Sequence, residues 1–357
     1  MKVSKKAKAL LQTTRKPYAL GKRLAVDISL SENPLGCSPR TLMALKSSPI
    51  SQYPDPKLVK LKRAISQCFK VPVATISIGN GSEALIDLIP RILLDPQNEA
   101  IIPETTFPLF EKGVVLAGGK PVFSKMKKDF SIDLEDIKKK ITKKTKLIFL
   151  CNPNNPTGKV LKGQKIIKFV RNVSPLMVLV DEANIDFAGQ SVMKDVKRLK
   201  NLIVLRSFSK GPGLAGLRIG FCVGPREFIK VLERARQPFP VSVLSEKAAI
   251  ASLQDKKFIE KSKKFMKQQR GFLTEELRQR GFKVIDSSSN NILVKVDGFF
   301  DSSTRLTRLL SQKGVSVVDG VNFRGLGKSF IRITPGLTKT NKKFLKVIDQ
   351  ILKENSL

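Results

Sequence analysis

The stretch that decides the fold is residues 201–220, NLIVLRSFSKGPGLAGLRIG. It opens with a short apolar and β-branched run, Leu202 to Leu205, which is typical of a buried strand rather than a helix. The run ends in the hydroxyl residues Ser207 and Ser209, and Lys210 then opens a glycine-rich loop. Because a lysine at the end of a buried strand loses hydration, its amine needs a partner or a covalent bond. Lys210 is therefore a candidate Schiff-base lysine.

Arg218 follows Lys210 by eight residues and lies in a second apolar segment. Its guanidinium, together with the hydroxyls of Ser207 and Ser209, supplies donors that suit a phosphate group. A lysine beside such a phosphate cradle indicates pyridoxal 5'-phosphate as the cofactor. For this motif alone, the alternative is a lysine on a solvated loop between two core strands.

The composition limits the class of protein. The 357 residues suffice for two domains with ample core, and 41% hydrophobic and 27% charged residues are ordinary for a soluble globular chain. No apolar run approaches the roughly 20 residues that span a bilayer, so we expect no membrane partner. The chain has no histidine, which excludes Ser-His-Asp and Cys-His catalysis and histidine-ligated metal sites; we expect no metal. The cysteines form no C-x-x-C pair and favour a reduced, cytoplasmic setting: Cys37, Cys68, Cys151 and Cys222.

The net charge of +36 is the unusual bulk property. The basic residues are spread along the chain, mostly on expected helix faces such as residues 256–283, where Phe258, Phe265 and Phe272 recur as a core-facing stripe. No nucleic-acid-binding motif accompanies the charge, so we interpret it as a lysine-rich solvated surface without a specific nucleic-acid partner. Residues 1–23 carry basic but no acidic side chains and lack an apolar centre, which indicates a leading helix or arm rather than a signal peptide.

Short apolar runs alternate with helical patterns through most of the chain. This alternation predicts an α/β fold with a mainly parallel sheet covered on both faces, in which ligands bind at the carboxyl ends of the strands. From about Val241 onward the texture changes to a long helical stretch followed by short strands at residues 291–296 and 330–334. The change predicts a second, smaller α+β domain. The expected strands of the large sheet are residues 74–78, 100–102, 121–123, 147–150, 178–180, 202–205 and 219–223.

One polar motif, GNGSEALIDLI, follows the first of these strands. Gly79 and Gly81 free the backbone to approach a ligand, and Ser82 with Glu83 opens the next helix. The amides at a helix N-terminus form an anion site. An ordinary strand-to-helix turn with a serine cap is the alternative.

Further candidate residues also stand at strand ends. Phe107, in PETTFPLF, has a ring that could lie flat on a planar ligand. Asn155, in CNPNNPTG, would present an amide to a ligand oxygen. Asp181 ends a buried strand, where a carboxylate is costly without a cation, and is a candidate partner for a protonated ring nitrogen. Arg332, in FIRIT, either faces solvent or clamps a carboxylate.

Taken together, NPNNPTG, the aspartate-ended strand, SFSK with its arginine and FIRIT resemble the fold-type I pyridoxal-phosphate aminotransferases of class I/II. The set KPYALGK, SENPLG, QYPDP, GNGSEALIDL and SFSKGPGLAGLRIG is similar, more narrowly, to histidinol-phosphate aminotransferases and their close paralogues. The resemblance runs from about Pro17 to the end of the chain. It implies a large domain, residues 41–240, with a seven-stranded, mainly parallel sheet between helices. It also implies a small α+β domain from both chain ends, residues 1–40 and 241–357.

The resemblance implies a role for each motif residue. Lys210 would hold the cofactor covalently and then move a proton between the substrate and the cofactor. Asp181 would pair with the ring nitrogen, Asn155 with the ring hydroxyl, and Phe107 would stack on the ring. The cofactor phosphate would be held by Gly81, Ser82, Glu83 through its amide, Ser207, Ser209 and Arg218, with Tyr53 reaching across from a second subunit of a homodimer. Substrate would be bound by Arg332 at the α-carboxylate, and by Asn155, Asn33 and Tyr18.

The sequence departs from the family pattern at two positions. Asn184 stands where the family usually has a tyrosine whose hydroxyl helps to stabilise the ionised ring oxygen, so we expect a changed pKa of the bound cofactor. Val318 stands where many histidinol-phosphate enzymes have an arginine that pairs with the substrate phosphate, and Arg324 is a possible substitute.

We therefore expect a pyridoxal-phosphate aminotransferase that works by a two-step, ping-pong exchange between amino acid and 2-oxo acid substrates. Histidinol phosphate with 2-oxoglutarate and glutamate is the first hypothesis. The alternatives are an aminotransferase for aromatic or other amino acids, a phosphothreonine-type decarboxylase, and a degenerate protein that binds the cofactor or nucleic acid. The joint presence of Lys210, Asp181, Asn155, Arg218 and Arg332 argues against the degenerate protein.

Overall fold

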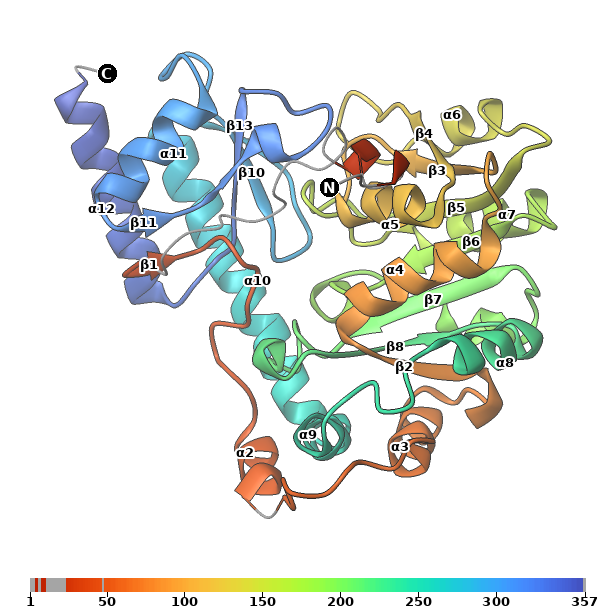
Figure 1. Ribbon diagram of the computed structural model, residues 1–357. Coiled ribbons are helices and arrows are strands. Elements are labelled where there is room, and N and C mark those ends of the chain that lie inside the picture. Colours follow the sequence, from red (N-terminus) through yellow and green to blue (C-terminus); the bar gives the residue numbers. More distant parts are fainter. Residues whose placement is uncertain (1–3, 6–7, 11–23, 47, 356–357) are drawn as a thin grey trace.

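The centre of the molecule is a seven-stranded sheet (Figure 1). The computed structural model describes residues 4–5, 8–10, 24–46 and 48–355. In the order β2-β8-β7-β6-β5-β3-β4, only β8 runs antiparallel to its neighbours, so the expected mainly parallel α/β fold is confirmed. The strands are β2 (Ile76–Asn80), β3 (Glu99–Pro103), β4 (Lys120–Ser124), β5 (Thr145–Cys151), β6 (Met177–Asp181), β7 (Leu202–Ser207) and β8 (Ile219–Val223).

The sheet is buried on both faces, which explains why its central strands read as continuous apolar runs. In β7, Leu202 and Val204 pack into the core on one face, and Ile203 and Leu205 pack into the core on the other. Neighbouring residues of a strand point to opposite faces, so a strand with apolar residues at every position needs helices on both sides.

Helices cover these two faces. One face is covered by α4 (Gly81–Leu93), α5 (Leu109–Ala117) and α8 (Arg226–Ala235), which contribute Leu85, Phe110 and Ile229 to its core. The other is covered by α3 (Val59–Phe69), α6 (Leu134–Lys139), α7 (Gly163–Asn172) and α9 (Val243–Leu253). The short α2 (Pro39–Lys46) packs against α9.

A second core lies around a four-stranded antiparallel sheet with the order β12-β13-β10-β9, as the small α+β domain requires. Val26 and Ile28, which precede α2, belong to this second core, and β1 (Val26–Asp27) pairs in parallel with β11 (Val315–Ser316). The remaining elements are β9 (Lys283–Ile285), β10 (Ile292–Lys295), β12 (Val318–Asp319), β13 (Phe330–Ile333), α10 (Lys256–Gln279), α11 (Ser303–Gln312) and α12 (Thr338–Glu354). Short 3-10 helices are η1 (Val73–Thr75), η2 (Ile185–Phe187), η3 (Met193–Lys197), η4 (Ala215–Leu217) and η5 (Gly320–Asn322).

The long helix α10 runs from the large core to the small one (Figure 1). Its apolar stripe buries Met266 and Leu273, while Phe258, Phe265 and Phe272 are partly buried. Because Val241, Ala248 and Ala249 belong to the core of the large sheet, the packing favours a domain boundary within α10. The division after residue 240 stays a proposal.

In the part of the chain that the structure describes, no helix is both long enough and apolar enough to span a membrane. The cysteines are all free thiols: Cys37 and Cys68 are half-buried, and Cys151 and Cys222 are buried.

Candidate active site

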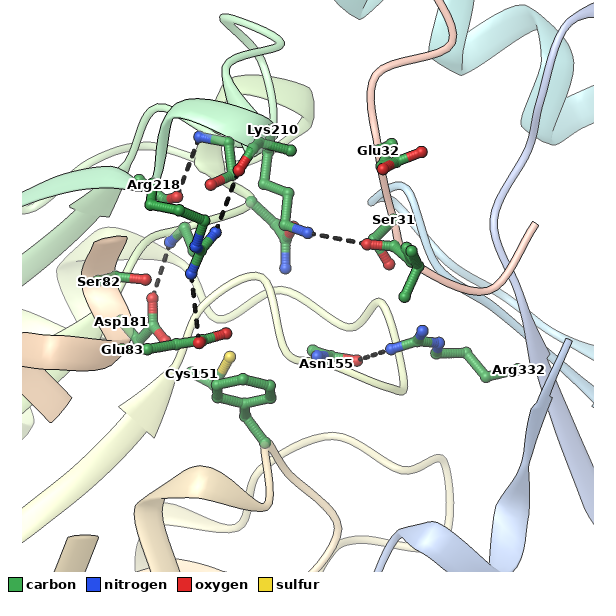
Figure 2. A pocket seen from close by; sticks show the side chains of 18 residues that line it. Ser31, Glu32, Ser82, Glu83, Cys151, Asn155, Asp181, Lys210, Arg218 and Arg332 are labelled. Atoms are coloured by element: carbon green, nitrogen blue, oxygen red, sulfur yellow. Dashed lines mark hydrogen bonds and ion pairs between the residues drawn. The ribbon is translucent and has the colours of Figure 1, made fainter. Parts of the chain in front are cut away.

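A cavity of about 360 Å³ opens where the carboxyl ends of β2, β5, β6 and β7 meet and β8 begins. Its size suits a small-molecule ligand. The large domain lines it with Ser82, Glu83, Phe107, Cys151, Asn155, Asp181, Ala183, Asn184, Ser207, Ser209, Lys210, Ala215, Gly216 and Arg218, and the small domain with Leu30, Ser31, Glu32 and Arg332 (Figure 2). Parallel strands bring their carboxyl ends to one edge, so the polar residues that follow each strand converge there.

Lys210 projects into this cavity from the loop after β7. Its Nζ donates a hydrogen bond to the carbonyl oxygen of Leu30 at 3.1 Å. Burial, assisted by the positive charge of Arg332, lowers the pKa of Lys210 from 10.5 to about 8. A sizeable fraction of the amine is therefore neutral, and nucleophilic, near physiological pH.

Asp181 ends β6 and is 4% exposed. Burial raises the pKa of its carboxyl from 3.8 to about 6, although the amide of Ala183 donates to Oδ1 at 2.9 Å and Lys210 lies near. A cation placed beside this carboxylate would recover the lost solvation and keep it ionised. The position suits a protonated ring nitrogen.

The part of the cavity around Arg218 and the start of α4 is built to hold an anion. Helix α4 begins at Gly81, and the side chain of Asn80 makes no capping hydrogen bond to its first turn. Arg218 lies over this helix start, with Nη2 at 3.2 Å from Oε2 of Glu83. Gly81 has φ of +71°, and a Cβ there would lie 2.8 Å from Nη2 of Arg218. The positive φ favours glycine at this position, and helix amides with a guanidinium form a phosphate cradle.

Phe107 and Asn184 line the same cavity. Phe107 lines the cavity, with its ring held edge-on against Phe110 at a centroid distance of 5.8 Å. Asn184 is 4% exposed, and its Oδ1 is a buried acceptor with no hydrogen-bond partner among the described residues. A buried polar atom without a partner costs free energy that a ligand group can recover. The donors and acceptors present therefore fit pyridoxal 5'-phosphate.

Arg332 closes the cavity from the small domain. It is 1% exposed on β13, and its Nη1 donates to Oδ1 of Asn155 at 2.9 Å (Figure 2). Its Nη2 donates to the carbonyl oxygen of Ser29, and the guanidinium lies 5.6 Å from the ring centroid of Phe323. A guanidinium fixed in this way is suited to a carboxylate or phosphate of the substrate.

Two predicted side chains among the described residues, those of Tyr53 and Asn33, do not line the cavity. Tyr53 is 81% exposed and stacks on Phe239 at a ring distance of 4.6 Å. Asn33 uses its amide within the protein, since Nδ2 donates to the carbonyl of Gly211 at 2.8 Å and to the hydroxyl of Ser262 at 2.9 Å. Tyr18 lies outside the described residues. Contact of these residues with cofactor or substrate stays a prediction.

Arg324 does not take the place of the arginine that is missing at Val318. Val318 is fully buried in an apolar cluster that includes Leu293 and Phe323. Arg324 pairs with Oε1 of Glu111 at 2.9 Å and lines a second cavity, whose wall also includes Phe107. The suggestion that Arg324 replaces the missing arginine is therefore not supported by its position.

Sequence reasoning missed several cavity residues. Leu30, Ser31 and Glu32 come from the turn-rich segment 28–39, and Cys151 is the last residue of β5. Cys151 directly precedes the motif NPNNPTG, and this position could have predicted that it lines the cavity. The contribution of segment 28–39 depends on β1, which anchors it in the small domain, and the sequence pattern does not show that pairing.

Comparisons with known proteins agree with this geometry. Residues 26–348 match the family described as aminotransferase class I and II. A histidinol-phosphate aminotransferase of Methanosarcina barkeri is 36% identical over 340 residues, which are 94% of this chain and 91% of the relative.

Two solved structures share the fold. The histidinol-phosphate aminotransferase of Clostridium acetobutylicum is 27% identical, with a TM-score of 0.85 over 92% of this chain and 99% of its own. That of Sinorhizobium meliloti, solved with pyridoxal 5'-phosphate, is 22% identical, with a TM-score of 0.87 over 99% of this chain and 96% of its own. The family match and the M. barkeri relative each span most of the sequence that builds the cavity. The chain belongs to the class I and II aminotransferases.

Proposed function

We propose that this aminotransferase exchanges an amino group between L-histidinol phosphate and 2-oxoglutarate. The observation that carries the proposal is the agreement of the relatives: proteins named histidinol-phosphate aminotransferase from M. barkeri and Pelagibacter ubique are 36% and 34% identical over 94% and 92% of this chain. In both cases the likeness runs over more than nine tenths of this chain.

The cofactor of this class is pyridoxal 5'-phosphate, and each part of it has candidate partners. Lys210 would hold it covalently, Asp181 would face the ring nitrogen, Asn155 would donate from its amide to the ring oxygen, and Asn184 would lie beside the ring. Its phosphate would lie between Arg218 and the start of α4, with Ser82, Ser207 and Ser209 as further donors and Gly81 and Glu83 through the backbone of the first turn. When bound, the cofactor supplies an electron-withdrawing ring that stabilises negative charge on the amine-bearing carbon of the substrate.

The residues of the chain supply positioning and proton transfer. Since the pKa of Lys210 is about 8, its amine can give and take a proton near neutral pH, and the Leu30 carbonyl orients it. Asp181, when ionised, keeps a facing ring nitrogen protonated. Arg332 and Asn155, joined by their hydrogen bond, hold the anionic group of the substrate on the small-domain side of the lysine.

Both substrates carry an anionic group close to the amine-bearing carbon. Glutamate has a carboxylate on its amine-bearing carbon, whereas L-histidinol phosphate has a phosphorylated CH2OH group there. We infer that Arg332 receives either anion, because a guanidinium binds carboxylate and phosphate with similar paired hydrogen bonds. A single guanidinium would then serve both halves of the ping-pong cycle.

The test is the half-reaction. The purified protein, loaded with pyridoxal 5'-phosphate, is mixed with L-histidinol phosphate, and conversion of the cofactor to its amine form is followed by visible absorbance. We expect conversion at low substrate concentration and its reversal by 2-oxoglutarate. Conversion by glutamate or another amino acid without conversion by L-histidinol phosphate would contradict the proposed substrate, and release of carbon dioxide would indicate a decarboxylase.

A second candidate, an aminotransferase for an aromatic amino acid, is favoured by one observation. Val318 is fully buried in an apolar cluster, and Arg324, which is paired with Glu111, does not supply the missing guanidinium. A substrate without a phosphate needs no second guanidinium. The same half-reaction with phenylalanine and tyrosine distinguishes the two candidates.

We also propose that the protein acts as a homodimer. The described residues include seven exposed large apolar side chains, and four of them lie in one short segment: Leu42, Met43, Ile50 and Tyr53. A fifth, Phe239, stacks on Tyr53. Apolar residues gathered in this way favour a protein interface. A monomeric mass by light scattering, at the concentration used for activity, would overturn the dimer.

A cytoplasmic location is proposed from the reduced state of the cysteines.

A further inference from the structure

A charged cluster lies on the face of β7 that is turned away from the cavity. Neighbouring strand residues point to opposite faces, so Ser207 lines the cavity while Arg206 lies behind it. Arg206 is 7% exposed, and its guanidinium lies over the ring of Phe69 at 5.0 Å. Its Nη2 is 2.6 Å from Oδ1 of Asp186, and its Nη1 is 3.7 Å from Oε2 of Glu182.

The acidic partners come from the same turn that carries Asp181. Asp181 faces the cavity, whereas Glu182 and Asp186 lie behind it with Arg206. Glu182 is fully buried and accepts hydrogen bonds from the hydroxyl of Ser191 at 2.5 Å and the amide of Val192 at 2.7 Å. Because burying ions costs desolvation, such a cluster is weak evidence for stability and is better explained by the position that it enforces.

The position in question is the peptide that follows Lys210. A Cβ on Gly211 would lie 2.6 Å from Cβ and 2.8 Å from Cγ of Asp186, so the aspartate packs directly against the glycine Cα. From the opposite loop, Asn33 donates to the carbonyl of Gly211 at 2.8 Å. The residue next to Lys210 is thus held between the Asp186 side chain and the Asn33 amide.

We propose that Asp186, held by Arg206, is a positioning residue that fixes the backbone of Lys210 so that its amine points into the cavity. The inference rests on the proposed function, in which Lys210 carries the cofactor. Asp186 touches neither cofactor nor substrate; it acts through Gly211. Its loss would let the Lys210 peptide rotate while leaving the phosphate cradle of Arg218 and α4 in place.

The test measures Lys210 separately from the cradle. Pyridoxal 5'-phosphate is added to the cofactor-free full-length protein, the adduct is trapped with borohydride at intervals, and its site is mapped by mass spectrometry. With Asp186→Ala we expect trapping on Lys210 to be roughly tenfold to a hundredfold slower, the cost of a displacement of about 1 Å at a reacting group. Binding of pyridoxamine 5'-phosphate, which needs the cradle but forms no bond to lysine, is expected to be unchanged.

Two further variants separate positioning from general loss of structure. Asp186→Asn keeps the shape and an acceptor for Arg206, and is expected to restore most of the trapping rate. Asp319→Ala removes a buried carboxylate of the small domain that accepts from Ser303 and Thr304, both at 2.6 Å, and is expected to trap like the wild type. Should Asp186→Ala not fold, Gly211→Ala, which pushes the same contact from the other side, is expected to slow trapping.

The outcomes are distinct. Normal trapping in Asp186→Ala, equal slowing in Asp319→Ala, or equally weakened binding of pyridoxamine 5'-phosphate would overturn the positioning role while leaving the proposed function intact. A wild-type protein that traps no adduct on Lys210 would overturn the proposed function and this inference with it.

Discussion

Replacement of Arg332 by methionine is expected to slow the reaction of Lys210 with an aldehyde at neutral pH. The amine of Lys210 has a pKa of about 8 instead of 10.5, with burial as the larger cause and Arg332 as the next. At neutral pH this difference raises the neutral fraction of the amine roughly 300-fold, from about 0.03% to about 10%. The neutral amine is the nucleophile, so the rate follows this fraction.

The methionine variant removes the positive charge of Arg332 but leaves Lys210 buried. We therefore expect only part of the effect to disappear, with a roughly three- to tenfold slower reaction at neutral pH and no change at high pH, where both proteins carry a neutral amine. The matched control is Arg332→Lys, which keeps the positive charge and is expected to keep the wild-type pH midpoint.

The assay follows the rate of borohydride-trapped adduct on Lys210 in the cofactor-free protein as a function of pH. The aldehyde used is pyridoxal 5'-phosphate. Because Arg218 and α4, not Arg332, form the proposed phosphate cradle, it should still bind to the variant. A wild-type rate that keeps rising up to the ordinary lysine pKa of 10.5 would refute the effect of burial. A wild-type midpoint near 8 that does not move in Arg332→Met would refute the contribution of the arginine.

Three further predictions concern residues that would hold the phosphate and the ring of the cofactor. Asp181→Asn is expected to stabilise the cofactor-free protein at neutral pH: the folded pKa of about 6 lies above the unfolded 3.8, so ionisation penalises the fold increasingly as pH rises through this window. We expect the free energy of unfolding, measured with urea, to rise by roughly 1–3 kcal/mol, and the variant to retain the cofactor more weakly. The prediction is wrong if the stability difference between variant and wild type is the same at acidic and at neutral pH. Gly81→Ala, whose Cβ would lie 2.8 Å from Arg218 Nη2, is expected to weaken cofactor binding roughly tenfold in equilibrium dialysis, whereas Gly271→Ala, with open space around its Cβ, leaves binding unchanged. Asn184→Tyr adds a donor to the ionised ring oxygen and is expected to lower the pH midpoint of the visible absorbance of the cofactor-bound protein; a midpoint at or above that of the wild type contradicts the expectation.

Local patterns were sufficient to predict the elements of the large domain. The apolar runs predicted every strand of the seven-stranded sheet to within a few residues, because strands buried on both faces leave a continuous apolar signal. The start of α4 at Gly81 and the placement of Lys210 after β7 also follow from local sequence. Boundaries were less accurate: the first expected strand, residues 74–78, begins as the 3-10 helix η1, and β2 continues to Asn80.

Contacts between distant segments could not be predicted in this way. Asn33 belongs to a motif that the resemblance assigned to substrate binding, yet its amide binds Gly211 and Ser262. Arg324 has the charge expected of a phosphate ligand, but Glu111 and the ring of Phe123, 3.9 Å away, engage it elsewhere. Which partner a long polar side chain chooses depends on the neighbours that the fold brings near it.

The sequence by itself determined the fold class, the family and the chemical types of the site, since apolar periodicity and residue identity are local properties. Only the tertiary structure decided the geometry of the site. It joins Arg332 to Asn155 across two domains, sets the Leu30 carbonyl on Lys210, and packs Asp186 beneath Gly211. These contacts arise because parallel strands bring their carboxyl ends to one edge of the sheet. The segment after β1 and the later strand β13 then contribute Leu30 and Arg332 to the same cavity.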